Sequence, residues 1–312
     1  MQALLELAAA DERIVLLTGD LGYMVMEPFR ERFPQRFLNV GVAEQNMIAL
    51  ATGLAESGFR PYAYSIATFA ALRAFEFIRN GPVMHGLPVR IVGMGTGFEY
   101  GHDGVTHHAL EDIAVLRTQP GLTIVMPADC AQAAAAVRAT ASLPGPAYYG
   151  LAKDDRLSVP GLDGRFELGR LQIVRNGADL AIFAMGPVSA EAVAAADVLA
   201  ADGVEATVAI VSNFHPNPAE DVARLLETVP RAITVEVQSI SGGLAAFVSG
   251  VIASSGLTCK LCPLAVRTQS DGTSGSQPDR WRKHGLDRDS IVKAVMCALL
   301  PAAGSPVGAV VR

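Results

Sequence analysis

The sequence is poor in charged residues and in cysteine. Only 18% of its 312 residues are charged and the net charge is −6, so it lacks the basic patches of a nucleic-acid-binding protein. Four cysteines form no pattern of a disulfide framework. No uncharged apolar stretch reaches the about 18 residues of a membrane-spanning helix, and residues 1–10 lack the features of a signal peptide. These absences predict a compact, cytoplasmic globular protein that binds neither nucleic acid nor membrane.

Cys259 and Cys262 have the spacing of a redox motif or of half a zinc site. They lie in the apolar, β-branched run 257–266, which predicts a strand, where side chains three residues apart point to opposite faces. The sequence contains no second pair of this kind. A metal or redox role is therefore disfavoured.

Half of the residues are hydrophobic, and short apolar runs alternate with longer helical segments. This alternation predicts an α/β fold with parallel sheets. Strands are predicted at residues 14–20, 36–40, 61–66, 89–94, 122–127, 179–185, 205–211, 231–237 and 258–266. Helices are predicted at residues 1–10, 44–55, 69–79, 129–142, 189–201, 218–228, 242–254 and 290–300.

Glu44 is the one carboxylate in the apolar segment 41–55. At helical spacing it falls in line with Met47, Ile48, Ala51 and Ala55. Burial on this stripe would favour a protonated or proton-sharing carboxyl near neutral pH, and a buried carboxyl needs a partner. The alternative is an ordinary helix with its acid in the first turn, where the helix dipole favours it.

A second candidate site lies in the loop that follows the predicted strand 89–94. Three of the six histidines, His102, His107 and His108, fall within seven residues together with Asp103, between glycines. A zinc site is one interpretation, but no fourth ligand at a useful spacing stands out. Acid–base or hydrogen-bonding work on a polar substrate is favoured, and a purely structural polar loop stays open.

Several motifs together resemble the C-terminal half of the transketolase family. They are residues 41–47, 64–80 and 100–112, with shorter matches at 20–21, 235–236, 242–244 and 272–286. The resemblance covers nearly the whole chain and implies two three-layer α/β/α domains with mainly parallel sheets. The expected boundaries are 1–155 for the pyrimidine-binding domain, 156–166 for a linker rich in charged residues and glycine, 167–300 for the transketolase C-terminal domain and 301–312 for a tail.

The resemblance implies thiamine diphosphate as the coenzyme. In the family, the glutamate at the position of Glu44 hydrogen-bonds a ring nitrogen of the aminopyrimidine and favours the imino tautomer, which takes the thiazolium proton. Phe69 matches the aromatic residue that stacks on the pyrimidine, and Ile66 stands where a second aromatic is common. Asp20 and Leu21 fit positions near the coenzyme at the subunit interface.

The resemblance also implies a substrate site. Asp103 and His107 match a pair that hydrogen-bonds substrate hydroxyls near the reacting carbons. Lys153 stands near the position of a phosphate-contacting arginine, although lysine lacks the bidentate fork of arginine. Residues 22–24 are Gly-Tyr-Met, where transketolases that act on sugar phosphates carry Thr-Pro-Ser.

The family holds the coenzyme diphosphate through a divalent metal bound by a Gly-Asp-Gly motif, and this sequence contains none. We therefore expect one subunit of a split transketolase. A partner chain, equivalent to the N-terminal half, would hold the diphosphate and Mg²⁺ or Ca²⁺, in an α2β2 assembly around a homodimer of this chain.

The expected reaction transfers a two-carbon ketol unit from a ketose, expected as its phosphate, to an aldehyde or another acceptor. Alternatives are the β subunit of a 2-oxo-acid dehydrogenase or a deoxyxylulose-phosphate synthase-like enzyme. A non-catalytic scaffold subunit is the alternative from another class, but it would not need to retain the residues Glu44, Asp103 and His107.

Overall fold

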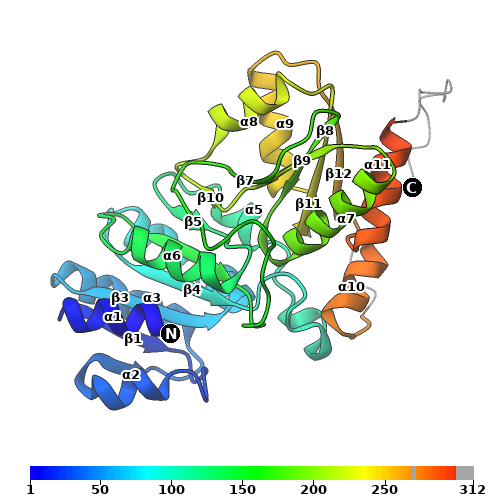
Figure 1. The fold of residues 1–312 in the computed structure, drawn as a ribbon. Helices are drawn as coiled ribbons and strands as arrows, with labels where there is room; N and C mark the ends of the chain where they lie inside the picture. Colours follow the sequence, from blue (N-terminus) through cyan, green and yellow to red (C-terminus); the bar gives the residue numbers. More distant parts are fainter. Residues whose placement is uncertain (269–271, 300–312) are drawn as a thin grey trace.

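The computed structural model describes residues 1–268 and 272–299, which form two α/β halves (Figure 1). Along the chain, the colour runs from blue to green in the first half and from green through yellow to red in the second. Each half is built on one mainly parallel sheet, with seven strands in the first and five in the second. The expected α/β architecture is thus confirmed, while the tail expected at 301–312 lies outside the described residues. In the described ranges, none of the helices has the length and apolar character needed to cross a bilayer.

The first sheet has the strand order β10-β5-β6-β4-β3-β1-β2. All neighbouring pairs are parallel except β10, which runs antiparallel to β5. Its strands are β1 (Ile14–Thr18), β2 (Phe37–Asn39), β3 (Arg60–Ile66), β4 (Arg90–Met94), β5 (Thr123–Val125), β6 (Ala147–Leu151) and β10 (Asn213–Phe214). The helices of this half are α1 (Gln2–Ala10), α2 (Glu27–Arg32), α3 (Glu44–Glu56), α4 (Phe75–Ile78), α5 (Asp112–Leu116) and α6 (Cys130–Thr140).

The second sheet has the order β12-β11-β8-β9-β7, and only β7 runs antiparallel to its neighbour. Its strands are β7 (Gln172–Arg175), β8 (Leu180–Ala184), β9 (Ala206–Ile210), β11 (Arg231–Ser239) and β12 (Lys260–Val266). The helices are α7 (Ser189–Ala201), α8 (Ala219–Leu226), α9 (Leu244–Ser254), α10 (Gln277–His284) and α11 (Arg288–Leu299).

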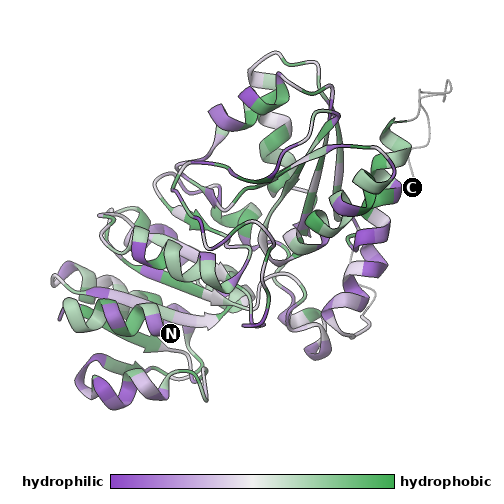
Figure 2. Cartoon of the chain, viewed as in Figure 1, coloured by the Kyte–Doolittle hydropathy of each residue, from purple (hydrophilic) through white to green (hydrophobic). Residues whose placement is uncertain are grey.

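The two halves share apolar packing. One buried cluster contains Leu17 and Ile91 from the first sheet together with Phe183 and Val248 from the second half. Figure 2 shows the strands of the second sheet as mostly hydrophobic, whereas α10 on the outside is mostly hydrophilic. Strand β10 belongs to the second half of the chain but pairs with β5 of the first sheet. The halves are therefore held together by both a common core and a shared sheet edge.

The segment predicted as a continuous helix at 69–79 is irregular. It consists of a π-helical turn at Phe69–Arg73, the short helix α4, and a second π-helical turn at Arg79–Val83. Pro82 lies inside the second turn, where it cannot donate a backbone hydrogen bond. Turns of this kind occur frequently at functional sites.

Candidate active site

Three elements meet at the carboxyl edge of the first sheet. Strands β1 and β3 are parallel neighbours with Thr18 opposite Tyr64, so the residues that follow these two, Gly19 and Ser65, lie side by side. Helix α3 begins at the same place with Glu44. A Cβ atom on Gly19 would lie 3.6 Å from both Glu44 Oε1 and Ser65 Oγ. Since ligands of open α/β sheets bind outside this edge, Glu44 stands at the expected position for a functional carboxyl.

Glu44 lies on the apolar stripe that the sequence predicts. It is 1% exposed, and the other buried residues of α3 are Met47, Ile48, Ala51 and Ala55. The carboxyl has two partners. Ser65 Oγ donates a hydrogen bond of 2.8 Å to Oε1, and Arg73 Nη1 lies 2.7 Å from Oε2 in an ion pair.

Arg73 also joins Glu44 to the aromatic residues of the site. Its guanidinium carbon lies 4.3 Å from the centre of the Phe69 ring. The His107 ring meets Phe69 edge-on, with 5.2 Å between ring centres. The structure therefore brings together Glu44, Phe69 and His107, which the sequence singles out separately.

The histidine-rich loop folds into two 3₁₀ turns, Gly101–Asp103 and Val105–His107. Asp103 is exposed and His107 is half-buried, with its Nδ1 2.9 Å from Thr106 Oγ1. His108 is buried against Phe98, and this burial lowers the pKa of its ring. In residues 1–268 and 272–299, no group of three His, Cys, Asp or Glu side chains is arranged to hold a metal ion.

Lys153 contacts the residues that begin this loop. Its Nζ lies 3.8 Å from the centre of the Tyr100 ring, and its backbone N–H donates to Glu99 Oε2 at 3.1 Å. Burial raises the pKa of the Glu99 carboxyl. Since the rings of Tyr100 and His107 are 6.2 Å apart, a row of contacts leads from Lys153 through the loop toward Phe69.

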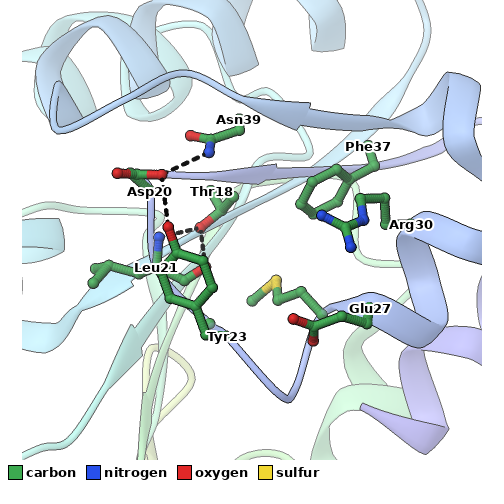
Figure 3. A pocket seen from close by; sticks show the side chains of 10 residues that line it. Thr18, Asp20, Leu21, Tyr23, Glu27, Arg30, Phe37 and Asn39 are labelled. Atoms are coloured by element: carbon green, nitrogen blue, oxygen red, sulfur yellow. Dashed lines mark hydrogen bonds between the residues drawn. The ribbon is translucent and has the colours of Figure 1, made fainter.

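Asp20 and Leu21 line a small pocket at the ends of β1 and β2, beside Gly19 (Figure 3). Asp20 has a φ of +60°, a conformation that aspartate tolerates better than most residues. Its carboxylate accepts hydrogen bonds from Asn39 Nδ2 at 2.8 Å and from the Tyr23 hydroxyl at 3.2 Å. The lining residues are Thr18, Asp20, Leu21, Gly22, Tyr23, Met26, Glu27, Arg30, Phe37 and Asn39.

Ile66 ends β3 directly after Ser65 and is buried, with 6% exposure. Because successive side chains of a strand point to opposite faces, its place next to Ser65 does not by itself bring it to Glu44, and its role at the site stays a prediction. Two residues of this site, Ser65 and Arg73, were not predicted from the sequence as functional. The signal for Arg73 is its position four residues after Phe69, where helical turns bring side chains together.

Comparison with known proteins gives a consistent assignment. The model of the transketolase pyrimidine-binding domain matches residues 1–154, and that of the transketolase C-terminal domain matches residues 169–291. The chain is 36% identical to a putative transketolase C-terminal section of Methanocaldococcus jannaschii, over 95% of this chain and 93% of that protein. It is 32% identical to one subunit of an apulose-4-phosphate transketolase of Phocaeicola vulgatus, over 94% of both chains.

A solved structure gives the same result. It is described as the inactive beta4 tetramer of a split-gene transketolase, and its chain superimposes with a TM-score of 0.86 at 34% identity. The match covers 96% of both chains.

Proposed function

The chain belongs to the transketolase family, and from this premise we propose that it is the pyrimidine-binding subunit of a two-chain, thiamine diphosphate-dependent transketolase. The observation that carries the proposal is the buried Glu44 carboxyl, which the Arg73 guanidinium joins to the Phe69 ring. The family relation implies thiamine diphosphate, which supplies the electron sink for breaking a carbon–carbon bond next to a carbonyl.

The residues present fit the aminopyrimidine ring of this coenzyme. A flat ring that carries nitrogen atoms needs a stacking surface and a proton partner. Phe69 offers a half-buried aromatic ring, and Glu44 offers a carboxyl that Ser65 holds in place. The planar Arg73 guanidinium occupies both the stacking surface and the carboxyl, because it lies over the Phe69 ring and donates a hydrogen bond to Glu44. The site therefore accepts a flat, nitrogen-bearing group.

In this proposal each residue has one task. The Glu44 carboxyl, oriented by Ser65, would exchange a proton with a ring nitrogen of the coenzyme. Phe69 and the buried Ile66 would hold the coenzyme ring. His107, which meets Phe69 edge-on, would act with Asp103 to hydrogen-bond hydroxyl groups of the donor substrate and to stabilise developing charge.

Lys153 stands at the outer end of the loop, as a single positive charge for an anionic tail of the substrate. We expect a ketose phosphate as donor, an aldehyde or a similar carbonyl compound as acceptor, and a two-carbon ketol unit as the group transferred.

A partner chain is part of the proposal. The sequence has no Gly-Asp-Gly motif for the diphosphate metal, and the relative from Phocaeicola vulgatus is itself named as a transketolase subunit. We propose that the partner binds the diphosphate and Mg²⁺ or Ca²⁺. Asp20 and Leu21, in the pocket beside Gly19, would then face the coenzyme at the boundary between the chains of an α2β2 assembly.

The test is Glu44→Ala in the complex reconstituted with the partner chain. Removing an acid–base group lowers turnover by roughly 100-fold or more, so we expect loss of ketol transfer with an unchanged circular dichroism spectrum. Glu56→Ala, at the exposed end of the same helix, is the matched control and should keep full activity. Full turnover by Glu44→Ala would contradict the mechanism.

The donor assay separates the related enzymes. Turnover with a ketose phosphate and an aldehyde supports ketol transfer. Turnover with pyruvate instead would assign the pair to a deoxyxylulose-phosphate synthase-like or 2-oxo-acid dehydrogenase-like reaction.

A further inference from the structure

Arg73 makes the two contacts that the proposed function assigns to the coenzyme ring. We propose that Arg73 occupies the place of the aminopyrimidine in the coenzyme-free subunit and must leave it before thiamine diphosphate can bind. The inference rests on the proposed function, because it takes Glu44 and Phe69 as the residues that receive the ring.

The contacts of Glu44 support this exchange. Ser65 Oγ donates a hydrogen bond to Oε1, and Arg73 Nη1 donates one to Oε2, so each carboxyl oxygen already has a partner. The guanidinium carbon also lies 4.3 Å from the centre of the Phe69 ring, close enough to cover that face of the ring. A second flat group cannot stack on the same face of Phe69 while the guanidinium is there.

The local backbone explains how Arg73 reaches both partners. Phe69 and Arg73 are the first and last residues of one π-helical turn. Side chains four residues apart in a helical turn lie on one side of it, so the Arg73 side chain can return over the Phe69 ring. Glu44 begins α3 at the adjacent strand end, within reach of the guanidinium.

Burial and exposure give the exchange a physical reason. Glu44 is 1% exposed, and a buried carboxylate without a partner is strongly unfavourable. Arg73 supplies that partner while the coenzyme is absent. Because the Arg73 side chain is 42% exposed, its guanidinium can move into solvent without leaving a second buried charge. Once it has left, Oε2 of the carboxyl is free to hydrogen-bond a ring nitrogen of the coenzyme.

The exchange lowers the apparent affinity for the coenzyme. When only a fraction of the molecules is open, the measured dissociation constant rises by the inverse of that fraction. If Arg73 covers the site in about nine molecules of ten, the loss is roughly tenfold. A variant whose residue 73 cannot cover the site should bind the coenzyme more tightly than the wild type by this same factor.

The test is Arg73→Met in the complex reconstituted with the partner chain. Methionine removes the charge and the planar group but keeps an unbranched side chain. We expect thiamine diphosphate to bind roughly tenfold more tightly and to associate faster, by equilibrium dialysis and stopped-flow fluorescence. Arg79→Met is the matched control. Arg79 begins the second π-helical turn, and its guanidinium donates a hydrogen bond to Asn80 and not to Glu44. It should bind the coenzyme as the wild type does.

A double-mutant cycle tests the route through Glu44. In the Glu44→Gln background Arg73 has lost its anionic partner, so Arg73→Met should give little further gain. If the methionine variant does not fold, Arg73→Lys replaces it, since lysine keeps the charge but cannot stack as a plane. Its gain should be smaller and in the same direction.

The outcomes are distinguishable. A wild-type complex that does not bind thiamine diphosphate overturns both the proposed function and this inference. A wild-type complex that binds it, with Arg73→Met binding equally or more weakly, overturns only the inference. Weaker binding by Arg73→Met would instead make Arg73 a contact of the bound coenzyme.

Discussion

Asp112 should make the stability of the protein depend on pH. This residue begins α5 and is 0% exposed. Its Oδ2 accepts a hydrogen bond of 2.9 Å from the Tyr148 hydroxyl, whereas Oδ1 has no hydrogen-bond partner among the described residues. Burial raises the pKa of Asp112 from 3.8 to about 7. The perturbation we choose is Asp112→Asn, which removes the ionisation and keeps an oxygen that can accept from Tyr148.

The magnitude follows from the change in pKa. One unit of pKa corresponds to about 1.4 kcal/mol, so ionising Asp112 in the folded protein costs about 4 kcal/mol. Because the folded state binds this proton more tightly than the unfolded state, the contribution to stability falls as the pH rises from about 4 to about 7. It is constant above that range. Asparagine does not ionise, so its contribution to stability does not change with pH. Across this window, the free energy of unfolding of the variant should therefore rise relative to that of the wild type by up to about 4 kcal/mol.

The assay is urea unfolding of the purified chain at intervals between about pH 4.5 and 7.5, followed by circular dichroism. The wild type and Asp112→Asn are compared at each pH, so that titrations common to both cancel. Asp163→Asn serves as control, because Asp163 is exposed and asparagine tolerates its positive φ. A difference between wild type and Asp112→Asn that stays constant over the whole range would refute the reasoning.

Two further changes test other contacts. Ser65→Ala removes the hydrogen bond to Glu44 Oε1. Since a hydrogen bond to a charged group is worth about 1.5–3 kcal/mol, steady-state kinetics of the complex should show kcat lowered by roughly 10- to 150-fold. Gly243→Ala would place a Cβ 1.9 Å from Glu236 Oε2 and displace the carboxylate that accepts from two backbone N–H groups at the start of α9. Scanning calorimetry should show a lower Tm, whereas Gly250→Ala, open on the same helix, should not lower it.

Local patterns explain why much of the fold was predictable. Strands such as β1 and β8 are buried at every position, and this produces the short, continuous apolar runs of parallel sheets. The stripe of α3 follows from the helical period alone, so the burial of Glu44 was predictable too. Strand β10 could not be found in this way, because it is two residues long and is defined by its pairing with Val125 and Ile124, almost ninety positions earlier.

The partners of Glu44 were unpredictable for a related reason. Ser65 and Arg73 are 21 and 29 residues away from Glu44 along the chain, and no sequence period connects such positions. They meet because β1 and β3 are parallel neighbours and end at the same edge, beside the start of α3. The irregular turn at Phe69–Arg73 interrupts the helix that the pattern predicted and directs the arginine back to that edge.

Residues of the second half of the chain support the histidine-rich loop of the first half. The Gly275 N–H donates to the Gly101 carbonyl at 3.0 Å, and a Cβ on Gly101 would lie 2.4 Å from the Gly275 oxygen. Gln277 Nε2 donates to Glu99 Oε1 at 2.7 Å. The loop therefore depends on a backbone approach that only glycine permits and on a side chain from α10. The same loop places His107 against Phe69. Separating the two halves would therefore remove the support of His107, whereas Glu44 would stay in place at the edge of the first sheet.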